Sequence, residues 1–380
     1  MSADPPVVLL TGAPTSFVAL RILRRLLQRD RALRVRCLVQ PRHRDEIDPI
    51  LERLEPADRE RVSILEGDTG SIDLGLSGKE YLALRDEVSV IHHAAAVAYL
   101  GASRETAVGA NVRGACEILE LAEAAPKLEH LVHWSTASVS GRRRGFVLEG
   151  ELDSDAGFHN VVEETRFEAE SLIAEAAHDL PITILRPAIV VGDSATGEID
   201  RLDGPYLLIR LLLNAPTDWT LPLPDRGETP LNLVPIDYVV DAGLQIAADP
   251  RSIGGTFHLV DPDPLTARRV FELIAEATGR PPPRLAVPLS LVAGLLRAPG
   301  LHRFAPMQAP RAFIEQLGTE VLYDDRNAKE LLAEADLRCP PFESYVNAMV
   351  RFVRDHDHIA EEPARAEGLP RSAVPPGERG

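Results

Sequence analysis

The stretch FHNVVEETRFEAE, residues 158–170, combines side chains that could move a proton and bind an anion. His159, Val162 and Arg166 are three and four residues apart, so on a helix they share one face. A histidine side chain titrates near neutrality and can act as a general acid. A guanidinium keeps its charge and can bind ribose or phosphate. The stretch therefore predicts proton transfer beside a fixed cation; the alternative is that His159 only caps the helix start or packs in a loop.

Other polar residues near this stretch are weaker candidates. Glu163 and Glu164 point more to the sides of the same helix and are predicted to be solvated charges. Thr136 follows a strand-like run, residues 131–135, where its hydroxyl could orient a carbonyl oxygen by hydrogen bonding. The alternative is that Thr136 is simply a β-branched residue at a strand end. Because a threonine hydroxyl is a weak acid, Thr136 alone could not supply a proton near pH 7.

The elements that must position these residues follow from an alternation of short apolar runs and longer amphipathic stretches. Runs such as VVLL and ITIL are almost entirely apolar, as strands buried on both faces should be. The predicted strands are residues 7–11, 35–39, 62–66, 88–92, 131–135, 182–186 and 256–260. The predicted helices are residues 17–28, 46–54, 107–125, 161–177 and 237–248. We therefore expect an α/β fold with a Rossmann-type, doubly wound parallel sheet.

The alternation of short apolar runs and amphipathic stretches changes after about residue 196, where proline-rich connections separate short helices. We expect residues 1–195, completed by 229–260, to form a nucleotide-binding domain. Residues 196–228 and 261–355 are predicted to form a smaller, mostly helical substrate or lid subdomain. The tail, residues 356–380, is rich in Glu, Arg and Pro and is predicted to be disordered.

Composition limits the classes of partner. A formal net charge of −17 and a pI near 5.1 argue against nucleic acid and anionic membrane surfaces. The longest apolar stretch, residues 286–296, is well short of the roughly 20 residues that a membrane-spanning helix requires. The N-terminus has no leader-like pattern. Cys37, Cys116 and Cys339 have no metal-like spacing, so we expect reduced thiols, no metal site and a cytoplasmic location.

The first strand-to-helix turn, TGAPTSFVA, should carry any dinucleotide site, because the pyrophosphate rests on a helix N-terminus that glycines allow it to approach. Gly12 is present. Ser16 and Ala19 add side-chain atoms where the backbone must come close, and Pro14 has no N–H to offer a phosphate. The turn therefore predicts weakened cofactor binding.

Several separate motifs resemble the extended short-chain dehydrogenases/reductases, specifically the thioester-reductase and fatty-acyl-reductase branch. The resemblance covers roughly residues 7–355. Besides the glycine turn, it rests on segments that match typical segments of that branch: EGDTGSIDLGLS, IHHAAAV with His93 in place of asparagine, ANVRGACEILELA, WSTASVSG, LRPAIVVGDSATGEID and LNLVPIDYVVDA. This branch implies a Rossmann fold, a dinucleotide cofactor and an acyl or thioester substrate, bound to a carrier protein or to CoA.

The resemblance also implies roles for individual residues. Asn111 falls at the active-site asparagine and Thr136 at the catalytic serine or threonine. The catalytic tyrosine is replaced by Val162 and the lysine by Arg166. In the family the tyrosine protonates the oxygen that receives charge during hydride addition, and the lysine lowers the phenol pKa and holds the cofactor ribose. Valine has no proton to give, which leaves His159 or water as a substitute acid.

The expected cofactor contacts are spread over three strand ends. The family resemblance places Gly12, Ser16 and Phe17 in the glycine turn, and Asp68 with Thr69 against the adenine; Arg166 would hold the ribose. After the second strand the branch carries an arginine for the 2′-phosphate of NADP; here that position is Gln40, with Arg42 and Arg44 close by. These arginines favour NADP(H) if a dinucleotide binds. The alternative is a solvated basic loop.

One further basic run, Arg142-Arg143-Arg144, could meet the phosphate of phosphopantetheine or CoA, or could be a solvated loop. Three hypotheses for the function follow from these observations. The first is a protein that has lost tyrosine-dependent hydride transfer, binds an acyl or polyketide-like ligand and performs non-redox cyclisation, isomerisation or elimination. The second is an NADPH-dependent thioester or aldehyde reductase with a substitute acid. The third is a non-catalytic binding or scaffold protein.

Overall fold

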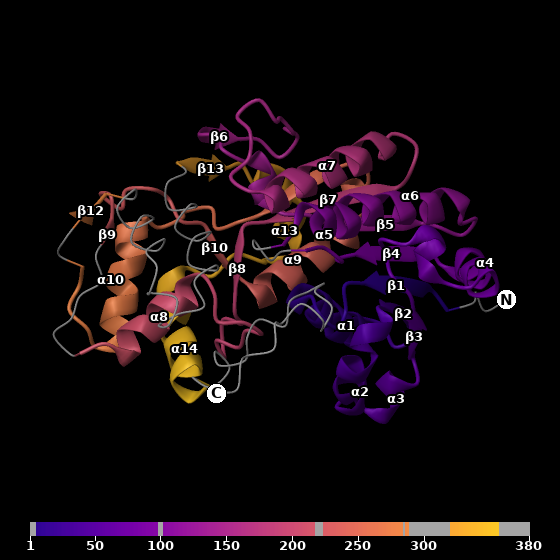
Figure 1. Ribbon diagram of the computed structural model, residues 1–380, viewed down its shortest axis with the longest axis horizontal. Helices are drawn as coiled ribbons and strands as arrows, with labels where there is room; N and C mark the ends of the chain where they lie inside the picture. The colour runs from indigo at the N-terminus through magenta and orange to yellow at the C-terminus, as the bar shows by residue number, and fades with distance from the viewer. Residues whose placement is uncertain (1–4, 98–101, 217–222, 284–285, 289–319, 357–380) are drawn as a thin grey trace, which may run out of the picture.

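The structure, a computed structural model, describes residues 5–97, 102–216, 223–283, 286–288 and 320–356 (Figure 1). The predicted tail beyond His356 and residues 289–319 of the predicted substrate subdomain lie outside the described residues. Within the described ranges, no helix is both long and apolar enough to cross a membrane.

A seven-stranded parallel sheet forms the centre of the fold. Its strand order is β11-β7-β5-β4-β1-β2-β3, so β1 lies at the point where the order of the strands reverses. The bounds, within two residues of those predicted, are β1 Val7–Thr11, β2 Arg34–Val39, β3 Val62–Glu66, β4 Val90–His93, β5 His130–Trp134, β7 Ile182–Pro187 and β11 Thr256–Leu259. The predicted doubly wound Rossmann-type sheet is confirmed.

Helices cover both faces of this sheet (Figure 1). One apolar cluster includes side chains of the sheet, α1, α9 and α13, and a second includes side chains of the sheet, α4, α6 and α7. The helices of these layers are α1 Phe17–Arg29, α2 Arg44–Glu52, α3 Pro56–Arg59, α4 Gly78–Glu87, α5 Arg104–Ala107, α6 Gly114–Ala124, α7 Val161–Ala176, α9 Ile236–Ala247 and α13 Arg326–Leu332. Because apolar layers bury both sheet faces, the strands can be apolar throughout, as their sequences indicated.

The helix predicted over residues 107–125 is interrupted. It consists of α5, a π-helical turn η3 at Val108–Arg113, and α6. Such π-helical insertions are frequent at functional sites. A continuous apolar pattern could not reveal the extra residue per turn, which is why the sequence predicted one helix.

A third apolar cluster joins α8 Pro205–Asn214, α10 Ala267–Thr278 and α14 Phe342–Asp355. These helices lie together at the left of Figure 1, away from β1, β2 and β3. Three short two-stranded sheets connect the parts: β6 Gly145–Val147 with β13 Val321–Tyr323, β8 Ile189–Val191 with β10 Leu233–Pro235, and β9 Leu223–Pro224 with β12 Ala286–Val287. The division into two domains stays a prediction.

Candidate functional site

Two cavities open at the carboxyl ends of the central strands, the edge at which open α/β sheets bind ligands. One, of about 250 Å³, lies after β5 and β7 against α7; we call it the β5–α7 pocket. The other, of about 480 Å³, lies after β1, β2, β3 and β4; we call it the β1–β4 pocket. Most of the candidate residues line one or the other of these two pockets.

The β5–α7 pocket contains a carboxylate–imidazole pair. His159 Nδ1 lies 2.9 Å from Glu163 Oε2, and the His159 backbone N–H donates to the same oxygen at 2.9 Å. Asn160 caps α7 through its side chain, which accepts from the Glu163 N–H, and this cap fixes the start of the helix. Both His159 and Glu163 line the pocket. The prediction that Glu163 is a solvated charge is therefore wrong, because its side chain is only 8% exposed.

Glu164 differs from its neighbour. Its carboxylate forms a surface ion pair with Arg104, at 2.7 Å and 3.0 Å from the two terminal guanidinium nitrogens. The two acidic residues are adjacent in sequence but point away from each other, since consecutive residues on a helix are 100° apart. The prediction of a surface charge therefore holds for Glu164 alone.

Hydroxyl groups follow β5 at the bottom of the same pocket. Thr136 caps the short helix η4, Ala137–Ser140, and its Oγ1 accepts the Ser138 N–H at 3.2 Å. The hydroxyls of Thr136 and Ser138 lie 3.0 Å apart. Both side chains line the pocket, as does Arg166, whose Nη2 donates to the Ser135 carbonyl at 3.4 Å. Thr136 and Arg166 thus lie where the sequence placed them, with His159.

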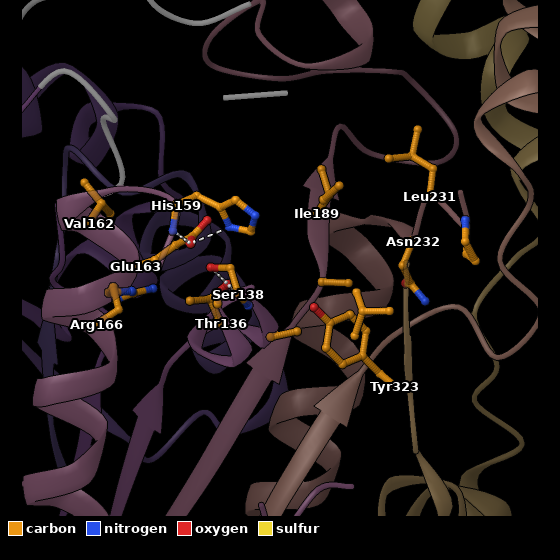
Figure 2. Close-up of a pocket in the computed structure, with 15 residues that line it drawn as sticks. Thr136, Ser138, His159, Val162, Glu163, Arg166, Ile189, Leu231, Asn232 and Tyr323 are labelled. Atoms are coloured by element: carbon orange, nitrogen blue, oxygen red, sulfur yellow. Dashed lines mark hydrogen bonds and ion pairs between the residues drawn. The ribbon is translucent and has the colours of Figure 1, made fainter. Parts of the chain in front are cut away.

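Val162 lines the pocket with its alkyl side chain at the position of the family's tyrosine. Figure 2 shows the α7 side of the pocket, with Val162, opposite a wall formed by Ile189, Leu231, Asn232 and Tyr323. Tyr323 comes from β13, far along the chain, and its hydroxyl lies 3.2 Å from Ser140 Oγ. Burial raises the pKa of this phenol. The pocket therefore does contain a phenol, but one that arrives from a different element.

Two buried histidines lie close to Arg166. His93 and His133 are paired across β4 and β5, and their rings stack at 5.4 Å. Burial, together with the Arg166 charge, lowers the pKa of His93 to about 3. Burial, His93 and Arg166 lower the pKa of His133 well below its usual value. Both rings are therefore neutral at physiological pH, and Thr11 Oγ1 hydrogen-bonds His93 Nδ1 at 2.9 Å.

Asn111 lines neither pocket within the described residues. It lies in the π-helical turn η3 and is 2% exposed. Its Oδ1 accepts the Val97 N–H at 2.8 Å, and its Nδ2 donates to Thr165 Oγ1 at 2.9 Å. The asparagine thus joins the segment after β4 to α7, and its contacts are those of a positioning residue.

The β1–β4 pocket is polar and contains several of the residues expected to hold a cofactor. Gly12 lies at its edge with φ of +100°, and a Cβ there would fall 2.7 Å from the Ala94 carbonyl oxygen. Asp68 and Thr69 line the pocket after β3, and Asp68 Oδ1 accepts the Gly70 N–H at 2.9 Å. Glycine at position 12 thus allows the turn after β1 to pack against the backbone after β4, where any side chain would clash.

Two arginines enter the β1–β4 pocket from different elements. Arg42, after β2, donates to the side chains of Gln40 and His43. Arg113, at the end of η3, packs over Gly109, where a Cβ would lie 2.8 Å from its Nη2. Among the described residues, neither guanidinium is ion-paired with a carboxylate, although Asp68 and Glu105 also line the pocket. Arg113 was missed although it lies within the quoted ANVRGACEILELA segment.

Ser16 and Phe17 do not line the β1–β4 pocket in the described part of the chain. The Ser16 hydroxyl caps α1 by accepting the Ala19 N–H, and the Ser16 N–H donates to the Gly12 carbonyl at 2.8 Å. Phe17 packs against two apolar clusters, with the Arg21 guanidinium carbon 5.2 Å from its ring centre. The turn therefore uses on itself a backbone N–H that a pyrophosphate could otherwise accept.

The comparisons with known proteins agree with this geometry. The chain matches the male sterility protein family, described by an NAD-binding model, over residues 10–243. The chain belongs to this family. It is thus an extended short-chain dehydrogenase/reductase of the thioester-reductase and fatty-acyl-reductase branch, and the resemblance stated from the sequence is confirmed.

Among relatives, it is 28% identical over 234 residues to the fatty acyl-CoA reductase wat of Drosophila melanogaster, covering 53% of this chain and 44% of the relative. It is 29% identical over 279 residues to the nonribosomal peptide synthetase asaC of Aspergillus flavus, covering 68% of this chain and 26% of that protein. The chain thus spans less than half the length of these relatives.

Among solved structures, the terminal R domain from the myxalamid PKS-NRPS biosynthetic pathway is similar with a TM-score of 0.79 and 25% identity, covering 96% of this chain and 94% of that one. A thiolation-reductase di-domain from an archaeal non-ribosomal peptide synthetase has a TM-score of 0.72 at 18% identity, covering 94% and 76%. The second similarity shows the fold alone.

Sequence reasoning missed several residues that line the β5–α7 pocket. The spacing of Glu163, four residues after His159, could have revealed the pair, since i and i+4 side chains meet on a helix. Asn232 and Tyr323 carry no local signal, because only the packing of distant segments brings them to the pocket. The membership of the family fixes the fold, while the reaction depends on these particular side chains.

Proposed function

We propose that this chain binds an acyl thioester in the β5–α7 pocket and moves protons at the carbon next to the thioester carbonyl, without transferring hydride. The observation that carries the proposal is the His159–Glu163 pair on the pocket wall, beside Val162 at the position of the missing tyrosine. A carboxylate that accepts from Nδ1 leaves Nε2 as the basic nitrogen and stabilises the imidazolium that forms when this nitrogen takes a proton.

The other polar side chains of the pocket suit such a reaction. His159 Nε2 takes a proton from the α-carbon, and the electron pair of the broken C–H bond moves onto the carbonyl oxygen. The Thr136 hydroxyl and the Arg166 guanidinium can stabilise that oxyanion. In a β,γ-unsaturated acyl group, return of the proton to the γ-carbon moves the double bond into conjugation and completes an isomerisation. In an acyl group with a β-leaving group, the enolate electrons form the Cα–Cβ double bond, and the leaving group departs with the electron pair of its own bond and takes the proton from His159, which completes an elimination. Neither sequence of steps needs an oxidant or a reductant.

The names of the similar proteins support a thioester as ligand. One is a fatty acyl-CoA reductase, another is a nonribosomal peptide synthetase, and a third is a thiolation-reductase di-domain of such a synthetase. We extend from them to this chain a ligand whose acyl group is joined by a thioester to the pantetheine arm of a carrier domain or of CoA. The apolar side chains of Val162, Ile189 and Leu231 line the pocket from opposite sides and are suited to contact the acyl chain.

Hydrogen exchange in D₂O tests the proposal directly. A panel of acyl-pantetheine thioesters is incubated with the chain, without nucleotide, and deuterium at the α-carbon is followed by mass spectrometry. We expect exchange that His159→Ala slows by about 100- to 10,000-fold, the usual loss on removing a general acid or base. His178→Ala, at an exposed histidine just after α7, is the matched control. Absence of exchange with wild-type chain, or equal rates in the two variants, contradicts the proposal.

A second candidate function is NADPH-dependent reduction of a thioester or aldehyde, favoured by the make-up of the β1–β4 pocket. Gly12 and Asp68 suit the pyrophosphate and adenine ends of a dinucleotide, and Arg42 with Arg113 could bind a 2′-phosphate. Bound NADPH would supply the hydride in such a reaction. The protein must supply the proton, for which His159 in the other pocket is the candidate.

Calorimetric titration with NADPH and NADP separates the two candidates. If the first is right, the native chain binds both weakly and does not oxidise NADPH in the presence of thioesters or aldehydes. The double variant Val162→Tyr/Arg166→Lys restores the family's acid and ribose contact, and comparison with it shows what these two positions control. Tight binding with carbonyl-dependent oxidation of NADPH by the native chain establishes the second candidate instead.

A further inference from the structure

The strands β6 and β13 form a thin wall between the β5–α7 pocket and the surface. They pair in parallel with Leu322 opposite Phe146 and Tyr323 opposite Val147. Because side chains alternate along a strand, the two faces of the pair have different environments. Val321 and Tyr323 line the pocket on the inner face. The outer face of β6–β13 lies at the periphery of the molecule (Figure 1).

Large apolar side chains cover this outer face. Phe146 is 58% exposed, Leu322 is 41% exposed and Leu148, two residues after Phe146, is 38% exposed. Phe146 and Leu322 are cross-strand partners, so these two side chains form one patch, and Leu148 follows directly after β6. Contiguous exposed apolar groups with a charged rim are typical of a protein interaction site.

Charged residues flank this strand pair: the exposed Glu320 directly precedes β13, and two exposed arginines precede β6. Arg142 and Arg144 are exposed and immediately precede β6. Among the described residues neither forms an ion pair, whereas Arg143 pairs with Glu151 at 2.7 Å. These are two exposed positive charges beside an apolar patch on a chain whose net charge is −17. They are suited to an acidic partner, since opposite charge at the rim of an interface guides association and orientation.

We propose that the outer face of β6–β13 is the docking surface for an acidic carrier domain that delivers the thioester to the β5–α7 pocket. This inference rests on the proposed function, because it takes the thioester as the ligand. The position of the strand pair supports this inference. Phe146 and Leu322 of the pair are exposed at the surface, and Val321 and Tyr323 of the same pair line the pocket. A carrier bound there is one strand layer away from the site that receives its acyl group.

Binding measurements on the full chain test the surface apart from catalysis. The probes are acidic thiolation domains excised from synthetases to which the chain is similar, each with a phosphopantetheine arm. We expect binding that weakens with salt and whose Kd rises by about tenfold or more in Arg142→Glu/Arg144→Glu, as for charges at an interface rim. Phe146→Ser/Leu322→Ser should raise Kd by a similar factor, since apolar side chains at the centre contribute most to affinity.

Matched controls keep the result specific. Arg31→Glu/Arg34→Glu changes two exposed arginines elsewhere, and Ile72→Ser removes an apolar side chain that is 82% exposed, so neither should alter Kd. His159→Ala should slow α-carbon exchange as stated above and leave the Kd for the carrier unchanged, which separates failure of the docking surface from failure of the proposed chemistry.

Three results overturn the docking surface. The first is no binding of any thiolation domain at up to about 100 μM, where complexes of moderate affinity are populated. The second is binding that the patch variants do not weaken. The third is self-association of the chain that Phe146→Ser/Leu322→Ser abolishes without affecting carrier binding, which would assign the patch to a second copy.

Discussion

The β1–β4 pocket and the β5–α7 pocket lie at the same edge of the sheet. They differ because backbone shapes the first around Gly12, whereas individual side chains carry the proposed roles in the second. Around Gly12 the β1–β4 pocket is formed by backbone in close contact, with φ of +100° at Gly12 and the Ala94 carbonyl where a Cβ would lie. In the β5–α7 pocket, by contrast, each chemical role belongs to one side chain. The resemblance places Val162 at the family's tyrosine, and a valine has no proton to give, whereas the β1–β4 pocket keeps a volume of about 480 Å³ although Ser16 and Ala19 stand where the resemblance expects glycines.

This difference teaches that the two halves of such a fold can change independently. A binding half that depends on the backbone keeps its shape through several substitutions. A catalytic half that depends on side chains changes its chemistry with one or two. In the proposed function, the His159–Glu163 pair supplies proton transfer from the same helix, because the side chains at these i and i+4 positions of α7 meet at the pocket.

Gly12→Ala gives the largest expected effect and tests whether the binding half depends on the backbone. A methyl group at φ +100° would lie 2.7 Å from the Ala94 carbonyl, so we expect a loss of about 3 kcal/mol in the free energy of unfolding. Urea unfolding measures it. Gly78→Ala is the control, because a Cβ there meets nothing within 4 Å. A Gly12→Ala chain as stable as the wild type would mean that the turn is not constrained.

Glu163→Gln tests whether the catalytic half depends on one charge. Glutamine can still accept from His159 Nδ1 but cannot stabilise the imidazolium. We expect α-carbon exchange to slow by about 30-fold, which corresponds to about 2 kcal/mol. The pH dependence of the rate should also change, and this a purely structural role would not produce. Exchange with wild-type rate and pH profile would remove Glu163 from the site.

The sequence predicted the sheet well and the site only in part. Runs such as VVLL are buried on both faces, and this local property determined the seven strands. Thr136, His159 and Arg166 were placed in one pocket because one strand end and one helix carry them. Tyr323 could not be found in this way, since its position depends on β13 pairing with a strand about 175 residues earlier. Ser16 was misjudged because its hydroxyl caps α1.

His93→Asn tests the surroundings of Arg166 in the β5–α7 pocket. The buried imidazoles of His93 and His133 lie close to this arginine. The pKa of His93 is lowered from its usual value of 6.5 to about 3. Between these values the unfolded chain binds more protons than the folded chain, so folding stability falls as pH falls from 6.5 towards 3. Each such histidine contributes about 1.4 kcal/mol per pH unit within that window.

Asparagine does not titrate, so this contribution disappears in the variant. The loss of stability between pH 7 and pH 5 should then be smaller by about 2 kcal/mol than in the wild type. Urea unfolding at the two pH values measures it, with His178→Asn as the control at an exposed histidine. An unchanged pH dependence would show that His93 is protonated in the folded chain.

Glu164→Ala should have the smallest effect and completes the comparison with Glu163. The Arg104–Glu164 pair is a surface ion pair, with side chains 58% and 34% exposed, and water and salt screen such pairs. Glu163, one residue earlier, is buried against His159. Exchange by Glu164→Ala should therefore stay within about twofold of the wild type, since surface ion pairs contribute little. If both substitutions slowed exchange equally, net charge near the pocket would explain the rate better than one positioned carboxylate.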